Sequence, residues 1–202
     1  MAVSPRHLNT PKVIEHLSRD PRLARVIERV GAQRFVPLRD GSHFGALARS
    51  IIYQQLSGKA AATIHGRFLG LFGGREPEPA DVLRCSDEAL RAVGLSRQKL
   101  AYLKDLAAKA EALVALHELP DDEVIARLTT VKGVGLWTAQ MFLMFRLGRP
   151  DVLPVLDLGI RKAAQKLYGL RTLPDGQKLE TLATKWRPYC TVASWYLWRS
   201  LE

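Results

Sequence analysis

Cysteine is scarce in this chain of 202 residues, which contains only Cys85 and Cys190. Two cysteines cannot hold a small secreted scaffold together, and they are too few to form a zinc or iron–sulfur site on their own. The five histidines show no metal-ligand spacing and have no cysteine or carboxylate partners at motif distances. We therefore expect two buried, reduced thiols in a cytoplasmic protein, and no metal centre built on cysteine or histidine.

Long apolar runs are also missing. No window approaches about 18 uninterrupted apolar residues, so we expect no membrane span. Residues 1–7 lack the apolar stretch of a secretory signal. Apolar residues nevertheless make up 47% of the chain and charged residues 25%, which is ordinary for a globular protein. These proportions exclude a disordered chain and allow a sizeable core.

Acidic residues are outnumbered by basic ones. Thirty lysines and arginines against twenty aspartates and glutamates give a formal net charge of +10 at pH 7. A basic surface favours polyanionic partners such as nucleic acid or anionic lipid. Because many cytoplasmic proteins are basic, the charge alone does not establish such a partner.

Strand signals are nearly absent, whereas helix signals are dense. The one plausible strand lies at 33–38, where Pro37 argues against a central place in a sheet. Capping side chains and prolines precede apolar runs with a helical period. These signals predict helices that start after Thr10, Asp20, Ser42, Ser57, Ser86, Ser96 and near Pro120, and further helices at 136–147, 158–168, 175–185 and 188–200. Ten or so short helices with short connections predict an all-α fold.

Two further expectations concern the middle of the chain. The helix after Ser96 is expected to bury an apolar stripe that runs from Leu100 to Val114. Residues 75–80, Arg-Glu-Pro-Glu-Pro-Ala, are expected to form a turn-rich linker. This linker is a candidate boundary between two lobes of one fold.

A Gly-Val-Gly segment at 133–135 separates two of the expected helices. Gly133 and Gly135 allow a positive φ and a close approach of the backbone to a ligand. The next helix begins at the second glycine, so its free N–H groups can bind a phosphate oxygen, with Lys132 beside them. Such a contact gives affinity and register without reading a base. The alternative is an ordinary turn between two helices.

An aspartate, Asp157, follows Gly135 by 22 residues and stands before a helix. Its neighbours Val155, Leu156 and Leu158 are apolar. An isolated aspartate in this position is most simply a helix N-cap with a purely structural role.

Together the two segments resemble the helix-hairpin-helix superfamily of DNA glycosylases, above all its alkylation-repair branch, the DNA-3-methyladenine glycosylase II type. Family members show a Gly-Val/Ile-Gly hairpin and then a loop ending in Pro-Val-Asp-Asp-Leu-Gly or similar, in which the second aspartate is catalytic. That position is Asp157 here, and Leu156 replaces the first aspartate. Further matches lie at 50–57 (Ser-Ile-Ile-Tyr-Gln-Gln-Leu-Ser), 94–99 (Gly-Leu-Ser-Arg-Gln-Lys) and 186–198. The resemblance runs in order from about residue 40 to the C-terminus.

The resemblance implies a helix-hairpin-helix DNA glycosylase fold, with two helical lobes flanking a substrate cleft. A single domain would span residues 1–202. One lobe would contain roughly residues 40–120 with the N-terminal helices and the C-terminal helix. The other would contain residues 121–185, with the hairpin and the catalytic aspartate.

The implied activity is DNA repair by base excision. Such an enzyme flips an alkylated purine, similar to 3-methyladenine, out of duplex DNA and hydrolyses its N-glycosidic bond, leaving an abasic site. Asp157 would stabilise the oxocarbenium-like sugar, position the water, or do both. Bifunctional members carry a Schiff-base lysine after the hairpin, where this chain has Trp137. The resemblance therefore implies a monofunctional hydrolase.

The same matches imply the binding residues. A cationic flipped base favours aromatic faces. The implied base pocket consists of Trp137, Trp198, Tyr53, Met141 and Leu158. The implied DNA contacts are Gln54, Gln55, Leu56, Ser57, Lys132, Gly133, Val134, Gly135 and Lys99.

Some of these assignments have alternatives. The wedge that fills the space of the flipped base is expected at Gln55, or failing that at Leu56, although Gln54 and Gln55 would equally serve as polar caps between two helices. Trp195 is expected in the core. Family members often have tyrosine where this chain has Met141 and Leu158, so a base preference cannot be taken from the resemblance.

The chemistry requires no cofactor. The resemblance implies at most a monovalent cation, Na⁺ or K⁺, held at the hairpin by the carbonyls of Thr129, Val131 and Val134. The expected partner is double-stranded DNA that contains alkylated bases, with no membrane contact. We expect a cytoplasmic monomer that works at the bacterial nucleoid.

Two other functions compete with this interpretation. A non-catalytic helix-hairpin-helix module that binds DNA structure would explain the charge and the hairpin. It would leave Asp157, Trp137 and Trp198 without a joint purpose. A glycosylase for another lesion class, such as mismatched or deaminated bases, is the nearer alternative.

Overall fold

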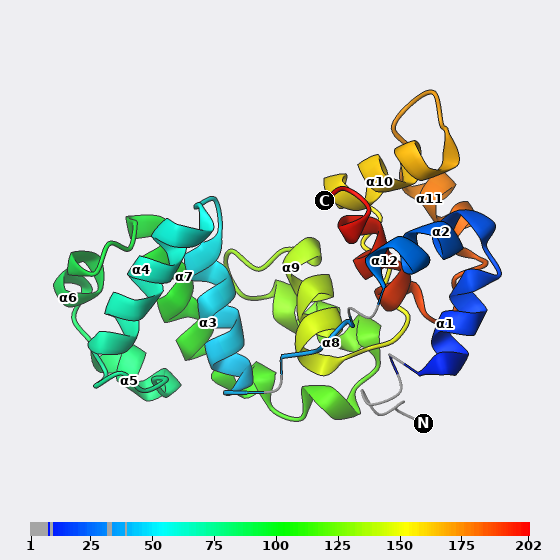
Figure 1. Cartoon of the computed structure of the whole chain (residues 1–202). Coiled ribbons are helices and arrows are strands. Elements are labelled where there is room, and N and C mark those ends of the chain that lie inside the picture. Colours follow the sequence, from blue (N-terminus) through cyan, green and yellow to red (C-terminus); the bar gives the residue numbers. More distant parts are fainter. Residues whose placement is uncertain (1–7, 9, 32–33, 39) are drawn as a thin grey trace. The chain divides into compact units, whose positions relative to one another are not determined.

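The computed structural model describes residues 8, 10–31, 34–38 and 40–202, and its regular elements are helices (Figure 1). Within these residues no strand forms, which confirms the all-α fold class. The chain divides into two compact units. Unit 1 comprises Met1–Leu38 and Leu143–Glu202, and unit 2 comprises Arg39–Phe142.

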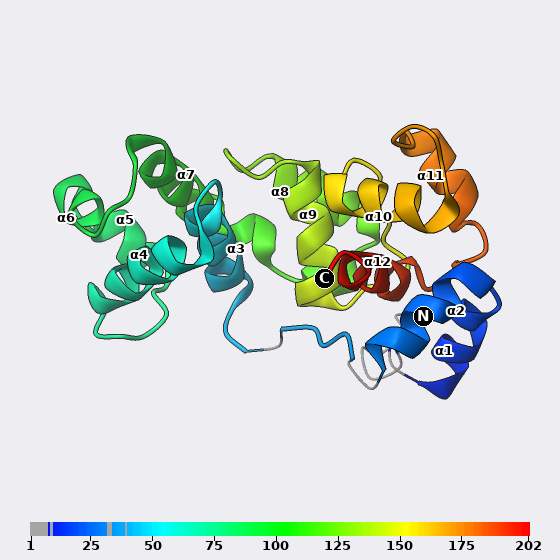
Figure 2. The same ribbon diagram turned by 45° about the horizontal axis from the view of Figure 1, so that its top comes forward.

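Unit 1 is built from both ends of the chain. Its α-helices are α1 (Pro11–Ser18), α2 (Pro21–Val30), α10 (Leu158–Tyr168), α11 (Gly176–Ala183) and α12 (Cys190–Arg199). The red helix α12 packs against the blue helix α2 and against α10 (Figures 1 and 2). Because residues 190–197 are all buried, α12 is the central core helix of this unit.

Unit 2 carries the middle of the chain. Its helices are α3 (His43–Tyr53), α4 (Gly58–Gly70), α5 (Pro79–Arg84), α6 (Asp87–Ala92), α7 (Arg97–Ala108), the 3₁₀ helices η2 (Ala110–Leu113) and η3 (Leu116–Glu118), α8 (Asp121–Thr129) and α9 (Leu136–Met141). Helix α3 packs against α4 and α7, and α7 also packs against α5 and α6. Helix α8 packs against α9, so the two helices on either side of the Gly-Val-Gly segment lie side by side.

The helix expected at 136–147 has two geometries. Helix α9 is followed directly by a π-helix, η4 (Phe142–Leu147), and the chain passes from unit 2 to unit 1 within it. π-Helical turns are rare in proteins, and those that occur often lie at functional sites. Phe145, in this turn, accepts a hydrogen bond at its carbonyl from Leu38 N–H (2.7 Å).

Six predicted helix starts are confirmed by their capping bonds. In each, the N-cap side chain accepts a hydrogen bond from a backbone N–H two or three residues later; these residues are Thr10, Asp20, Ser42, Ser57, Ser86 and Ser96. These bonds satisfy N–H groups that have no partner inside the helix. Local chemistry therefore sets where these helices begin.

The apolar stripe expected as far as Val114 is wrong at its end. Helix α7 stops at Ala108, and the chain continues as the 3₁₀ helices η2 and η3. Between these two helices Val114 is extended and Ala115 is left-handed, so the helical stripe is broken: Leu113 and Leu116 are buried while Val114 is 65% exposed.

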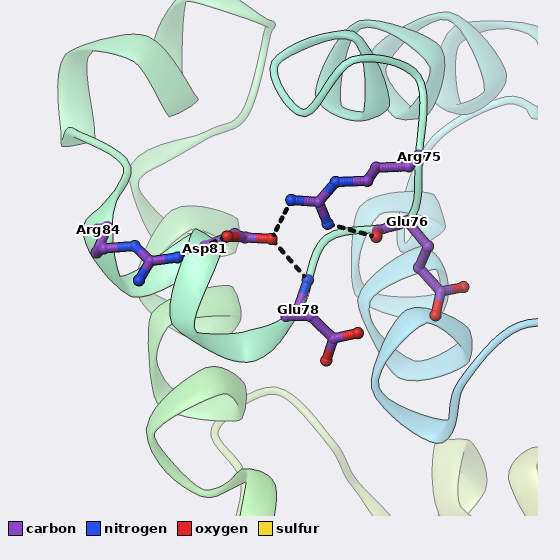
Figure 3. A network of polar contacts seen from close by, with 5 residues as sticks. All are labelled: Arg75, Glu76, Glu78, Asp81 and Arg84. Atoms are coloured by element: carbon purple, nitrogen blue, oxygen red, sulfur yellow. Dashed lines mark hydrogen bonds and ion pairs between the residues drawn. The ribbon is translucent and has the colours of Figure 1, made fainter.

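A short helix occupies part of the expected linker 75–80. Helix α5 begins at Pro79, where Asp81 accepts Glu78 N–H at 3.1 Å (Figure 3). Arg75 and Arg84 lie 2.7 Å and 2.8 Å from the Asp81 carboxylate, and the hydrogen bond from Arg75 lowers the pKa of Asp81. A proline at the first helical position with an acidic residue two positions later is typical of a helix start. The prolines of residues 75–80 were instead interpreted as a sign of turns, so this helix was not predicted.

The expected strand does not form in the part of 33–38 that the structure describes. Residues 34–38 are extended without sheet pairing, and residue 33 lies outside the described residues, as do residues 1–7. Cys190 is buried, which raises the pKa of its thiol, and Cys85 is only half-buried; both are free. Over the described ranges, no helix has the length and hydropathy needed to span a membrane.

The two units divide the chain at other residues than the expected lobes. Helix α8 packs against η2 and α9, so residues 121–142 belong with the middle of the chain. Helix α2 packs against α10 and α12, so the N-terminal helices share a unit with Asp157. Long-range packing of this kind has no signature in local sequence patterns.

Candidate active site and DNA-binding elements

Asp157 lies at the start of α10 in unit 1. Its carboxylate oxygen Oδ1 accepts hydrogen bonds from Ile160 N–H (2.8 Å) and from the indole Nε1–H of Trp198 (2.9 Å). The first bond makes Asp157 the N-cap of α10, as its position before the helix predicts. The second bond ties the carboxylate to the C-terminal helix α12, 41 residues away, and an N-cap does not require it.

The surroundings of this carboxylate are aromatic and closely packed. The Trp198 ring stacks on Phe145 of η4, with centroids 6.0 Å apart and an interplanar angle of 25°. A Cβ atom on Gly159 would lie 3.0 Å from Trp198 Cδ1 and 3.1 Å from Asp157 Oδ1. Gly159 thus allows the indole and the carboxylate to meet over the first turn of α10.

The side chains that border Asp157 in sequence are apolar and exposed. Leu156 is 64% exposed and Leu158 is 52% exposed. Both leucine side chains are thus open to solvent on either side of the half-buried carboxylate in the sequence. Leu158 therefore remains available for the predicted base pocket.

The remaining predicted pocket residues belong to unit 2. Trp137, on α9, is 48% exposed, and Met141 is half-buried. The ring of Tyr53 faces the guanidinium of Arg49, whose Cζ is 4.2 Å from the ring centroid, and packs edge-on against His65. Of the predicted pocket residues, Trp198 is the one bonded to Asp157 through its indole, within unit 1.

The other tryptophans have structural places. Trp195 is 8% exposed, which confirms its expected core position. Trp186 is fully buried, and its Nε1–H donates to the buried carboxylate of Asp20 at 3.2 Å. Asp20 also accepts from the hydroxyl of Tyr168 and pairs with Lys185 at 2.9 Å. Sequence reasoning found Asp20 only as a helix cap.

The Gly-Val-Gly segment forms the turn between α8 and α9. Gly133 has a φ of +80°, and a Cβ there would lie 2.2 Å from Tyr102 Cδ2, so this position requires glycine twice over. Gly135 is the N-cap of α9 with an ordinary φ of −93°, and a Cβ there would have nothing within 4 Å. The fold of the chain therefore does not require glycine at position 135. A ligand backbone that approaches the start of α9 would require it, because a side chain there would occupy the same space.

An ion-pair cluster that sequence reasoning missed braces this turn. The carboxylate of Asp105, on α7, accepts Lys132 N–H at 2.8 Å and the ammonium of Lys109 at 2.9 Å. Lys109 also donates to Thr130 O at 2.6 Å. Burial raises the pKa of Asp105, but these hydrogen bonds outweigh burial and lower it overall. The i,i+4 spacing of Asp105 and Lys109 was the available signal.

The side chain of Lys132 extends from the same turn. It is 70% exposed, and its ammonium lies 4.0 Å from Asp105 Oδ1. An exposed cation beside a helix start fits the predicted phosphate contact.

The turn between α3 and α4 contains the predicted wedge. Gln54 donates from Nε2 to Gly133 O at 2.9 Å, so the wedge turn and the hairpin are joined within unit 2. Gln55 is exposed and has a φ of +57°, which is uncommon for a residue other than glycine. Leu56 is 39% exposed, and Ser57 caps α4 through Ala60 N–H. The polar-cap alternative thus describes Gln54 but not Gln55.

Lys99 lies under this turn. Its ammonium donates to Ile52 O at 2.6 Å and to Gln54 O at 2.7 Å, and its side chain is half-buried. Burial lowers the pKa of Lys99. Lys99 therefore makes structural contacts within the protein, in addition to the DNA contact that was predicted for it.

The donor set predicted for a monovalent cation consists of the backbone carbonyls of Thr129, Val131 and Val134. Neutral carbonyls in a tight turn suit a singly charged ion. The Val131 carbonyl already accepts Val134 N–H at 3.0 Å and retains a second lone pair. Among the described residues, no cluster of histidine, cysteine and carboxylates offers a different metal site. A monovalent cation on these three carbonyls stays a prediction.

Comparison with known proteins decides the family. The family described as HhH-GPD superfamily base excision DNA repair protein matches residues 48–188. The chain belongs to this family. The matched residues include the wedge turn, the hairpin and Asp157.

Proteins similar to this chain include DNA-3-methyladenine glycosylases. The chain is 37% identical over 160 residues to DNA-3-methyladenine glycosylase 1 of Schizosaccharomyces pombe, covering 76% of this chain and 70% of that protein. The crystal structure of a DNA-3-methyladenine glycosidase from Bacillus halodurans is similar with a TM-score of 0.82 and 41% identity, covering 95% of this chain and 89% of that one. The structure of 3-methyladenine DNA glycosylase from Schizosaccharomyces pombe in complex with abasic DNA gives a TM-score of 0.80 at 33% identity, covering 93% and 95%.

Proposed function

We propose that this protein is a DNA-3-methyladenine glycosylase of base excision repair, a hydrolase that removes alkylated purines from double-stranded DNA. The observation that carries the proposal is the Asp157–Trp198 pair in a chain of the HhH-GPD family. A carboxylate at a helix start, held by an indole on a second helix, is a prepared negative charge for an oxocarbenium-like transition state.

Asp157 is the proposed catalytic residue. Ile160 N–H and Trp198 Nε1–H hold its Oδ1 atom, so the orientation of the carboxylate is set before substrate binds. The carboxylate stabilises positive charge on the sugar and orients the attacking water. No acid is needed to protonate the leaving base, because a 3-alkylated purine is already cationic and leaves neutral.

The flipped base is bound by aromatic and apolar side chains. In unit 1 these side chains are Trp198 and Leu158, next to Asp157. Tyr53, Trp137 and Met141 are predicted for the same role and belong to unit 2. Electron-rich ring faces attract a cationic base by about 0.5–2 kcal/mol each. This proposal takes support from the stacked, half-buried Trp198 and the exposed Trp137.

The duplex is held through its backbone. The N–H groups at the start of α9 and the exposed ammonium of Lys132 bind a phosphate, while the side chain of Gln55 fills the space of the flipped base. A Na⁺ or K⁺ ion on the carbonyls of Thr129, Val131 and Val134 would add positive charge facing that phosphate. The protein acts as a monomer in the cytoplasm, at the nucleoid where its substrate is found.

Incubation with methylated duplex DNA tests this function. Free alkylated purines, identified by chromatography, are the expected product, and Asp157→Asn is the matched control. Binding without any released base would identify a non-catalytic module. Release only from duplex with mismatched or deaminated bases would identify another lesion class.

A further inference from the structure

Two lysines on α7 place their ammonium groups at the ends of other helices. Lys104 Nζ lies 3.1 Å from Leu83 O and 2.6 Å from Cys85 O, where α5 ends. The last carbonyls of a helix have no partner within it, and they lie at the negative end of the helix dipole. Lys104 is therefore a cap for α5 that is supplied from a neighbouring helix.

Lys99 makes the same arrangement at the end of α3. Its two carbonyl partners are Ile52 O at 2.6 Å and Gln54 O at 2.7 Å. Gln54 directly precedes Gln55 in the chain, and Ile52 lies three residues before it. The two capped helices lead into different segments. The helix capped by Lys104 is followed by the α5–α6 connection, and the helix capped by Lys99 is followed by the wedge turn.

The wedge turn needs support of this kind. Gln55 has a φ of +57°, a conformation that persists only when the surroundings hold it. Its neighbour Gln54 is held at both ends, by Lys99 at the backbone carbonyl and by Gly133 O at the side-chain amide. Gln55 is thereby held exposed, next to a residue that cannot rotate freely.

The environment of Lys99 differs from that of a phosphate contact. Its side chain is half-buried and two of its three donors are directed to carbonyls. Lys132, in contrast, is 70% exposed beside the hairpin.

We propose that Lys99 is a positioning residue for base flipping, which fixes the Gln54–Ser57 turn so that Gln55 enters the duplex, and that it does not bind a DNA phosphate. This inference rests on the proposed function in so far as Gln55 is the wedge. Lys99 would act in base flipping, a step that precedes hydrolysis of the glycosidic bond.

The salt dependence of binding separates positioning from phosphate contact. Each phosphate contact contributes about 0.9 to the slope of log affinity against log salt concentration. Lys99→Met, measured on undamaged duplex by anisotropy, should keep the wild-type slope, and Lys132→Met should lower it by about 0.9. A slope lowered by Lys99→Met would overturn the proposal.

Excision rates separate positioning from a general structural role. The same alkylated purine is placed opposite its normal partner and opposite an abasic site, and single-turnover rates are measured with saturating enzyme. Lys99→Met should be slower by about tenfold on the paired lesion and within about twofold of wild type opposite the abasic site, where flipping costs least. The matched control is Lys104→Met. It removes a lysine of the same helix, α7, that caps the end of α5 instead of α3, and it should keep wild-type rates on both substrates.

Other outcomes have definite meanings. Equal slowing of Lys99→Met on both substrates, or the same pattern in Lys104→Met, would refute the positioning role. If Lys99→Met does not fold, Gln54→Leu removes the other support of the turn and should show the same dependence on pairing.

A fluorescence measurement keeps this inference separate from the proposed function. With 2-aminopurine at the target position, wild-type protein should raise the fluorescence by unstacking the base, and Lys99→Met should not. If the wild-type protein releases no base, the proposed function is contradicted. The difference in 2-aminopurine fluorescence between wild type and Lys99→Met still tests the role of Lys99, because it measures base flipping and not base release.

Discussion

At the scale of single residues, Asp157 has two tasks that one substitution separates. Asparagine keeps an oxygen that accepts Ile160 N–H and Trp198 Nε1–H, and it is a good N-cap. Asp157→Asn should therefore fold normally and bind duplex DNA as wild type does. It should lose about 100-fold or more of its base-release rate, because the charge that stabilises the sugar cation is gone.

The measurement for Asp157→Asn is single-turnover release of alkylated purine, with thermal unfolding and duplex binding as controls. Retention of more than about a tenth of the activity would remove Asp157 from the catalytic role, since charge stabilisation is expected to contribute several kcal/mol.

Asp20 shows what a buried carboxylate does for stability. It is 3% exposed. Burial raises the pKa of Asp20, but hydrogen bonds from Tyr168, Lys185 and Trp186 outweigh burial and hold it below the ordinary value. A carboxyl group with a lowered folded-state pKa stabilises the protein above its unfolded-state pKa, and this contribution is lost as pH falls through the folded-state pKa.

Asp20→Asn should accordingly lower the free energy of unfolding at pH 7 by about 2–4 kcal/mol, because Lys185 and Tyr168 lose their charged partner. The deficit should shrink as pH falls below about 4. Urea unfolding of both proteins between pH 7 and pH 2.5 provides the comparison. A deficit that stays constant down to the lowest pH would show that the charge of Asp20 is not what stabilises the fold.

At the scale of elements, the hairpin separates a glycine needed for folding from one that folding does not need. Gly135→Thr places a capping residue at an ordinary N-cap φ in open space, so thermal stability should change little. Its side chain would occupy the space where a phosphate approaches the start of α9. Affinity should therefore fall by about tenfold or more for damaged and undamaged duplex alike.

Gly133→Ala is the contrasting variant for the hairpin. The φ of +80° and the contact with Tyr102 should make it unstable before any DNA is added. Duplex binding by anisotropy and thermal unfolding are measured for both variants. If Gly135→Thr weakened only the binding of damaged duplex, the hairpin would belong to the base pocket.

The elements also show how far sequence reasoning reaches. Six helix starts are local events between a side chain and a nearby N–H, so the sequence predicts them; they follow Thr10, Asp20, Ser42, Ser57, Ser86 and Ser96. The contacts of Lys99 are of another kind. Its partners are backbone carbonyls 45 and 47 residues away, and a carbonyl is the same in every residue. A bond of this type leaves no pattern in the sequence.

At the scale of the whole molecule, the candidate site draws on segments that lie far apart in the chain. Asp157 and Trp198 were each identified by resemblance, but the hydrogen bond between them results from the packing of α12 against α10. The grouping of the N-terminal helices with α12 likewise depends on buried surfaces. Resemblance can thus name residues such as Asp157 and Trp198, whereas the bond between them depends on long-range packing that no local pattern records.

The reaction product is the property that tests the whole molecule. The resemblance places Trp137 where bifunctional members carry a Schiff-base lysine, and Lys162 lies on α10, one turn beyond Asp157. Hydrolysis by water forms no imine, so the enzyme should leave an intact strand with an abasic site, which breaks only after alkali or heat. Borohydride should trap no covalent protein–DNA adduct. Denaturing gels with and without alkali, and mass spectrometry after borohydride, give the two readouts. An adduct on Lys162 or Lys132 would make the protein a lyase and would overturn the interpretation of Trp137, whereas intact strands with free alkylated purine in solution would establish the hydrolytic route.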